Sequence, residues 1–224
     1  MLWHQQAAEL KREFMIHVEI WSDIVCPFCF IGKKNFEADL KSYSGSEKIE
    51  VVWRSFELDP NAKKSQQVKI YDLIAKKYGR SVEWAKENNQ RLTAQGKTMA
   101  IDFDFEAIIP SNSFDAHRLL HLARAQNKQN ETADLLFKAY FSEGKDIALH
   151  AVLLDVAQQA GLDVEHARKI LESKEFEADV RSEQQEAQEL GISGVPAFVF
   201  NRKFLVSGAQ PVEAFLEVLK ESEK

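Results

Sequence analysis

The sequence contains only two cysteines in 224 residues, so at most one disulfide can form within the chain. It lacks any apolar run near the roughly 18 residues of a membrane span, and we expect no membrane contact. A net charge of -6 argues against general nucleic-acid binding. The first 14 residues lack the apolar core and cleavage site of a signal peptide, so we expect a cytoplasmic protein.

The two cysteines, Cys26 and Cys29, form a C-x-x-C motif where a strand pattern gives way to a helix pattern. Residues 16–21 alternate apolar and polar side chains, and a helical pattern begins at Pro27. A C-x-x-C at such a turn is typical of thioredoxin-like redox sites. A helix N-terminus stabilises a thiolate, and a second thiol can attack a mixed disulfide and release the substrate. Pro27 suits the first helical turn because it has no N–H to satisfy.

Two other interpretations of the cysteine pair stay open. The pair could be buried and purely structural, or it could bind zinc. Zinc is the weaker alternative because two thiolates need two further ligands. The sequence offers no second C-x-x-C and no closely spaced pair of histidines. We therefore expect no metal site.

The remaining patterns predict the order of the secondary structure. A second strand at residues 49–56 completes a βαβ unit, which requires a parallel strand pair. Helical patterns then fill residues 67–190, and strand patterns return at residues 197–200 and 204–206 before a last helix. We expect helix caps at the following positions: Gly79, Ser81, Ser113, Gly161 and Gly191.

This order predicts an α/β fold, a thioredoxin-like core with a large inserted all-helical domain. The core is discontinuous and comprises residues 15–66 and 191–224, and the insertion comprises residues 67–190. We expect the insertion to cover the active-site face as a lid or wall. Residues 1–14 form an N-terminal extension, and Met15 is an alternative start.

The second candidate segment is the dipeptide Val195-Pro196, immediately before a strand. A proline there suits a cis peptide bond, which costs little for an X-Pro pair. A cis bond would turn the N–H and C=O of Val195 outward, where they could pair with an extended substrate. An ordinary trans turn is the alternative, and the dipeptide by itself favours it.

Three parts of the sequence together resemble the DsbA-like oxidoreductases, specifically their FrnE-like branch. They are residues 20–33, residues 113–119, and residues 194–198 with residues 207–210. The resemblance extends from about residue 15 to 220. It implies a thioredoxin fold with a helical insertion, in which Cys26 attacks, Cys29 resolves and Pro196 is the cis proline opposite them. The same superfamily contains 2-hydroxychromene-2-carboxylate isomerases and kappa-class glutathione transferases, which carry a serine where Cys26 stands and use glutathione.

Four further residues are candidates for substrate contacts: Pro27, Phe28, His117 and Val195. A packing or surface histidine with satisfied hydrogen bonds is the alternative interpretation of His117. Asp23 and Glu57 could assist proton transfer near Cys29, but we expect both to be exposed carboxylates.

These features predict a thiol–disulfide oxidoreductase or isomerase that acts on a thiol- or disulfide-containing protein or small molecule. We expect no bound cofactor. One alternative is a glutathione-dependent isomerase or transferase of the same superfamily, with glutathione as co-substrate. Another is a non-enzymatic helical module whose cysteines sense oxidation. The sequence leaves the direction of electron flow and the oligomeric state open.

Overall fold

The computed structural model describes residues 15–45, 48–64 and 68–223. The predicted extension, residues 1–14, lies outside the described residues. The elements follow one another in this order: β1 (Met15–Ser22), α1 (Pro27–Ser42), β2 (Lys48–Ser55), α2 (Ile70–Tyr78), α3 (Val82–Lys97), α4 (Phe114–Ala125), α5 (Gln129–Phe141), α6 (His150–Gln159), α7 (Val164–Glu172), α8 (Glu177–Glu189), β3 (Ala197–Phe200), β4 (Phe204–Ser207) and α9 (Val212–Ser222).

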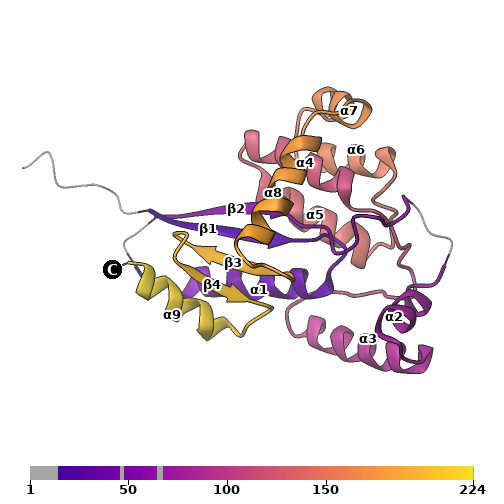
Figure 1. The fold of residues 1–224 in the computed structure, drawn as a ribbon, viewed down its shortest axis with the longest axis horizontal. Coiled ribbons are helices and arrows are strands. Elements are labelled where there is room, and N and C mark those ends of the chain that lie inside the picture. The colour runs from indigo at the N-terminus through magenta and orange to yellow at the C-terminus, as the bar shows by residue number, and fades with distance from the viewer. Residues whose placement is uncertain (1–14, 46–47, 65–67, 224) are drawn as a thin grey trace, which may run out of the picture.

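A single four-stranded sheet with the strand order β2-β1-β3-β4 forms the centre of the fold (Figure 1). Strands β1 and β2 are parallel, with Ile20 opposite Trp53, which confirms the predicted βαβ unit. Strand β3 runs antiparallel to β1 and forms a hairpin with β4. The α/β fold class with a thioredoxin-like core is therefore confirmed.

One face of the sheet packs against α1 and α9. The alternation in β1 buries Ile16, Val18 and Ile20, which expose 0 to 1% of their surface and belong to the main hydrophobic core. Phe36 of α1 meets Phe215 of α9, with ring centroids 5.4 Å apart. Burial of such large aromatic side chains contributes much of the stability of a core.

Helix α8 covers the opposite face. The indole of Trp21 is fully buried in a small second core together with Ala187 and Ile192. Its N–H donates to the carbonyl of Glu183 in α8 at 3.0 Å. Beside this core, the buried Glu19 pairs with Arg54 and Arg202. The long stretch of helices between β2 and β3 therefore returns to the sheet through α8.

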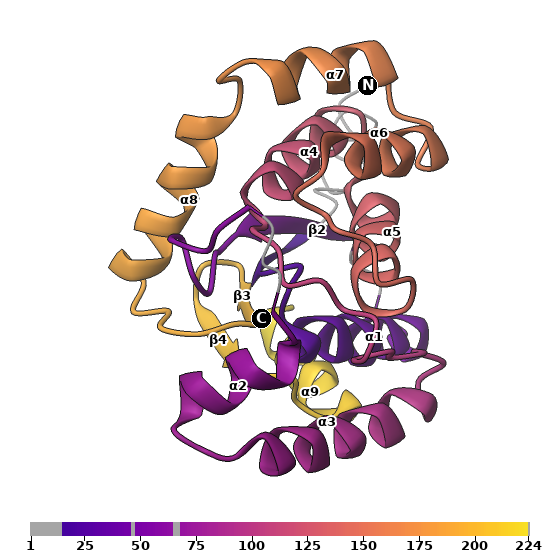
Figure 2. The same ribbon diagram turned by 90° about the vertical axis from the view of Figure 1, so that its right-hand side faces the viewer.

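The helices between β2 and β3 form two groups, which Figure 2 shows on either side of the sheet's edge. Helices α4 to α7 form one group, in which α4 and α5 contact β2 and α6 and α7 pack on the outer side. The side chain of Gln129 in α5 accepts from the N–H of Trp53 and donates to its C=O, both at 2.9 Å. Gln129 thus pairs with backbone groups of β2, which is an edge strand of the described sheet. Helices α2 and α3 pair with each other on the other side. Among the described helices, none has the length and apolarity needed to cross a membrane.

The predicted helix caps are confirmed in their positions. Gly79 ends α2 in a left-handed conformation, with φ of 62°, and the hydroxyl of Ser81 accepts from the N–H of Trp84 at the start of α3. Ser113 occupies the N-cap position of α4 as predicted, although its side chain makes no capping hydrogen bond. The side chain of Asn112 accepts from the N–H of Phe114 instead, at 2.9 Å.

Candidate active site

The C-x-x-C motif lies at the turn between β1 and α1. Cys26 occupies the N-cap position with extended backbone angles, and Pro27 begins the helix as expected. The N–H groups of Cys29 and Phe30 both point to the carbonyl of Cys26, at 3.1 and 3.4 Å. The N–H of Cys26 in turn donates to the carbonyl of Asp23 at 3.1 Å. Cys26 therefore stands at the positive end of the helix dipole.

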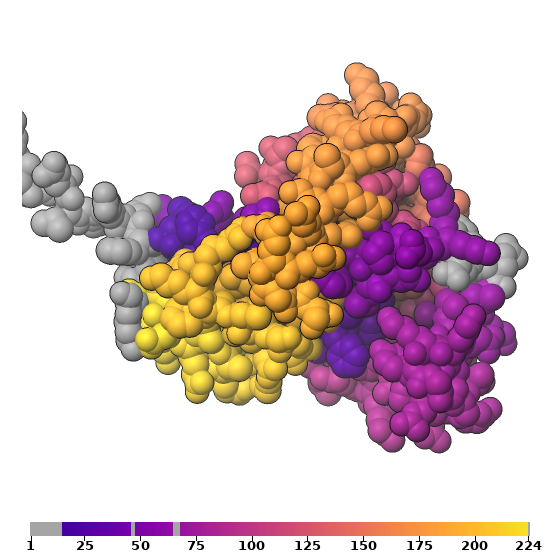
Figure 3. Space-filling view, in the orientation of Figure 1, coloured from indigo at the N-terminus to yellow at the C-terminus, as the bar shows by residue number. Residues whose placement is uncertain are grey.

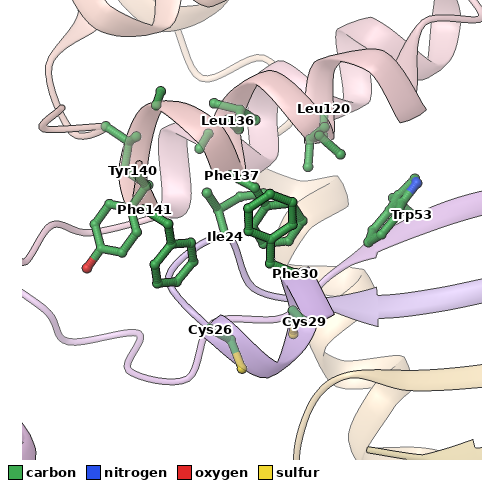
Figure 4. Packing of buried hydrophobic residues seen from close by; sticks show 14 of the residues in the cluster. Ile24, Cys26, Cys29, Phe30, Trp53, Leu120, Leu136, Phe137, Tyr140 and Phe141 are labelled. Atoms are coloured by element: carbon green, nitrogen blue, oxygen red, sulfur yellow. The ribbon is translucent and has the colours of Figure 1, made fainter. Parts of the chain in front are cut away.

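A cluster of aromatic rings fixes the start of α1. Phe30 stacks on Phe137 of α5, with ring centroids 5.0 Å apart, and it also packs against Phe141. Figure 4 shows these rings on one side of the helix start and the sulfur atoms of Cys26 and Cys29 on the other. Helix α5 thus packs against the first turn of α1, on the side opposite the two sulfur atoms.

The two thiols have different environments. Cys29 exposes 1% of its surface, and its sulfur accepts from the N–H of Asp23 at 3.5 Å. Burial raises the pKa of the Cys29 thiol well above its ordinary value, and the adjacent Cys26 raises it further. Cys26 exposes 4% of its surface and lines a pocket. Of the two, Cys26 is the thiol that an incoming molecule can reach.

The loop before β3 faces Cys26 across the site. The Val195-Pro196 bond is cis, which confirms the expected geometry. The Cys26 thiol donates to the carbonyl of Val195 at 3.7 Å. Gly32 on α1 allows the close approach, because a Cβ atom there would lie 2.9 Å from Cγ of Pro196. Two segments about 170 residues apart in the sequence are thereby brought together.

Beside the thiol opens a pocket of about 610 Å³. Its lining includes Cys26, Pro27 and Phe28. The Phe28 side chain is 46% exposed, which sets it apart from the buried aromatic residues of the core. These placements fit the predicted substrate contacts of Pro27 and Phe28.

The expectation that Asp23 and Glu57 are exposed was wrong. Asp23 exposes 0% and Glu57 exposes 5% of its surface. The carboxylate of Asp23 accepts from the N–H groups of Leu58 and Val25, at 2.7 and 3.3 Å. The carboxylate of Glu57 accepts from the guanidinium of Arg181 at 2.5 Å. Because these partners satisfy them, both carboxylates remain buried in the wall of the site.

The structure also corrects the expectation for His117. Its side chain is buried, does not line the pocket, and lies with Nε2 3.6 Å from a carboxylate oxygen of Asp23. Neither ring nitrogen has a hydrogen-bond partner among the described residues. His117 therefore lies behind Asp23, where it can contact neither a substrate nor the surface, and it is not a hydrogen-bonded packing histidine.

Two tyrosines of the pocket were missed from the sequence. Tyr140 exposes 3% of its surface, and burial together with the charges of Asp23 and Asp146 raises its pKa. Tyr78, at the end of α2, is 60% exposed. The sequence offered one signal for Tyr78, because a large aromatic residue on the last turn of a short helix can contact a ligand. It offered none for Tyr140, whose spacing in the helix is that of a buried core residue. Among the described residues, no group of three or more His, Cys, Asp or Glu side chains is placed to hold a metal ion.

Comparisons with known proteins agree with this geometry. Residues 17–220 match the family model of the DSBA-like thioredoxin domain. The protein YwbO of Bacillus subtilis (strain 168), which is uncharacterized, is 28% identical over 211 residues, which are 93% of this chain and 98% of that protein.

Solved structures are also similar, among them the following two. A probable DsbA oxidoreductase of Streptomyces coelicolor has a TM-score of 0.88 and 36% identity, covering 93% of this chain and 90% of that chain. A 2-hydroxychromene-2-carboxylate isomerase has a TM-score of 0.66 at 13% identity, over 92% of this chain and 95% of that chain, and shares the fold alone. The chain therefore belongs to the DsbA-like thioredoxin-domain family of oxidoreductases.

Proposed function

We propose that this protein is a thiol–disulfide oxidoreductase of the FrnE type, with Cys26 as the attacking thiol and Cys29 as the resolving thiol. The observation that carries the proposal is the position of Cys26, at the N-terminus of α1, in the pocket wall and 3.7 Å from the carbonyl of Val195. DsbA-like oxidoreductases act on thiol or disulfide substrates.

The exchange proceeds in two steps. The thiolate of Cys26 attacks one sulfur of the substrate disulfide, forms a mixed disulfide, and releases the other half of the substrate as a thiolate. Cys29 then loses its proton and attacks the sulfur of Cys26, which releases the second half as a thiol. The protein ends with a Cys26–Cys29 disulfide, and the substrate has gained two electrons. The same steps in reverse oxidise a dithiol.

Burial of Cys29 separates the roles of the two thiols. A thiol with a raised pKa stays protonated at neutral pH and does not attack external disulfides. Within the mixed disulfide, Cys29 attacks a sulfur held two residues away, and proximity compensates for its small thiolate fraction. The cis Val195-Pro196 loop completes the site, with the main chain of Val195 placed to pair with an extended substrate.

The direct test uses single cysteine replacements. Because the chain has only these two cysteines, each replacement leaves a single thiol, and any adduct maps to one residue. Cys26→Ser should abolish exchange with insulin and with glutathione disulfide. Cys29→Ser should still attack and should accumulate a mixed disulfide on Cys26, detected by mass spectrometry of the intact protein.

The proposal excludes two results. Exchange that persists in Cys26→Ser would show that the attacking group lies elsewhere. Adducts that form on Cys29 in Cys26→Ser as readily as on Cys26 in Cys29→Ser would contradict the assignment of roles.

A further inference from the structure

The pocket beside Cys26 is larger than the exchange reaction alone requires. It has a volume of about 610 Å³ and is bounded by the start of α1, the segment after β2, helices α2 and α3, the connector before α4, and the end of α5. A volume of this size is typical of sites for small molecules. Val195 and Pro196 are not among its lining residues, so the pocket and the cis-proline loop are separate neighbours of Cys26.

The lining of this pocket is mainly apolar and partly exposed. Three of the nine large apolar side chains that are exposed in the described residues line it: Phe28, Leu58 and Tyr78. Deeper lining residues include Ile74 of α2 and Leu92 of α3. Exposed apolar surface that converges on one concavity marks a site for an apolar ligand.

Access to the thiol favours a small partner. Cys26 exposes only 4% of its surface and lines the pocket, so a molecule inside the pocket is placed to reach the sulfur. In Figure 3, indigo atoms from the N-terminal part of the described chain reach the surface between the magenta α2–α3 pair and the yellow C-terminal elements. A thiol with so little exposed surface is reached more easily by a small disulfide than by a disulfide embedded in a folded protein.

We propose that the pocket binds the apolar body of a low-molecular-weight disulfide, whose sulfur is then attacked by Cys26. The substrate class is a small aliphatic disulfide that carries an aromatic or branched apolar group. The inference rests on the proposed function, since it assumes exchange at Cys26. It adds that the α2–α3 pair, rather than the thioredoxin-like core, determines which disulfide reacts.

The reaction balances without a further reagent when the protein starts in its dithiol form. The disulfide RS–SR takes two electrons from the two thiols of the protein. The S–S bond of the substrate breaks, the Cys26–Cys29 bond forms, and two RSH molecules leave with the two thiol protons.

The experiment compares disulfides of cysteines that carry different N-acyl groups. The reduced protein is mixed with the disulfide of N-(phenylacetyl)cysteine, the disulfide of N-acetylcysteine, or glutathione disulfide, and the single-turnover rate is measured. All three are disulfides of an N-acylated cysteine, so the sulfur chemistry is closely similar. We expect the phenylacetyl compound to react at least about tenfold faster than the other two, as apolar pockets discriminate by such factors.

Two variants and a control locate the preference. Tyr78→Ser and Ile74→Gln change the pocket without touching the thiols, and they should lower the ratio of the phenylacetyl rate to the N-acetyl rate several-fold. Leu205→Ser is the matched control, because Leu205 is 51% exposed on β4 and lies outside the pocket. It should keep the full preference.

A redox-inert compound separates binding from exchange. N-(phenylacetyl)-S-methylcysteine should bind the wild-type protein saturably in a calorimetric titration and should bind Tyr78→Ser more weakly. Equal rates for all three disulfides, or a preference that both pocket variants retain, would overturn the inference and leave the proposed function standing. Absence of reaction with every disulfide would overturn the proposed function and the inference with it.

Discussion

Gly32 is the position where one methyl group should disturb the site most directly. It lies on α1 against the cis-proline loop, and a Cβ atom there would lie 2.9 Å from Cγ of Pro196 and 3.4 Å from Cζ of Phe198. The favourable separation between carbon atoms is about 3.5 to 4.0 Å, so Gly32→Ala must push the loop away by about 0.6 Å or more. The displaced loop contains Val195, whose carbonyl faces the Cys26 sulfur at 3.7 Å.

Two opposing effects set the change in stability. Overpacking of a tight contact typically costs about 1–3 kcal/mol. Alanine in place of glycine inside a helix contributes about 0.5–1 kcal/mol in the other direction. We therefore expect Gly32→Ala to lower the free energy of unfolding by about 1 kcal/mol. We also expect exchange at Cys26 to be several-fold slower, because the substitution moves the Val195-Pro196 loop away from the Cys26 sulfur.

The assay measures both quantities in the same variants. Denaturant unfolding gives the stability, and stopped-flow exchange with glutathione disulfide gives the rate. Gly194→Ala is the matched control, because it lies in the same loop and a Cβ there meets nothing within 4 Å. It should change neither quantity appreciably. If Gly32→Ala were about 1 kcal/mol more stable than the wild type and reacted at the same rate, the close contact with Pro196 would play no part in the site.

Three further predictions concern buried titratable groups. Burial opposes the ionisation of Glu183, but hydrogen bonds and ion pairs with His121 and Arg54 prevail and lower its pKa to about 2. Its contribution of about 3 kcal/mol is present above pH 4.5 and is lost as the pH falls toward 2, so Glu183→Gln should be strongly destabilising in urea at pH 7 and nearly neutral at pH 2. Burial raises the pKa of Asp39 from 3.8 to about 6, so the ionised form destabilises the fold as the pH rises through this range. Asp39→Asn should raise the free energy of unfolding at pH 8 and change it little at pH 3.5, and a gain confined to low pH would contradict this sign. His117→Phe should keep the exchange rate within about twofold, because an apolar ring can replace a buried ring that has no hydrogen bonds; a tenfold loss would restore a role for His117 in the reaction.

The local patterns of the sequence were enough to predict the core of the fold. The alternation of Ile16, Val18 and Ile20 places the first strand, and the C-x-x-C marks the turn into α1 because strand and helix periods differ. The glycine after α2 and the serine before α3 act as caps through contacts within a few residues. The boundaries proposed for the inserted helical domain, residues 67–190, stay a prediction.

The chemical environment of side chains far from the motif could not be predicted in the same way. Asp23 and Glu57 are buried because Leu58, Arg181 and other groups distant in the sequence bind their carboxylates. Likewise, only the packing of α4 against the core shows that His117 points to Asp23 and away from the pocket. Such partners come together through tertiary structure, which leaves no periodic signal along the chain.

The central claim is that Cys26 and Cys29 act as one exchangeable dithiol. A redox titration of the wild-type protein in glutathione buffers, read by alkylation and intact mass, tests it most directly. The account predicts a single two-electron transition between the dithiol and an internal Cys26–Cys29 disulfide, with glutathione adducts only as a minor species. Two thiols that never form an internal disulfide at any buffer ratio, or a stable glutathione adduct in its place, would contradict it.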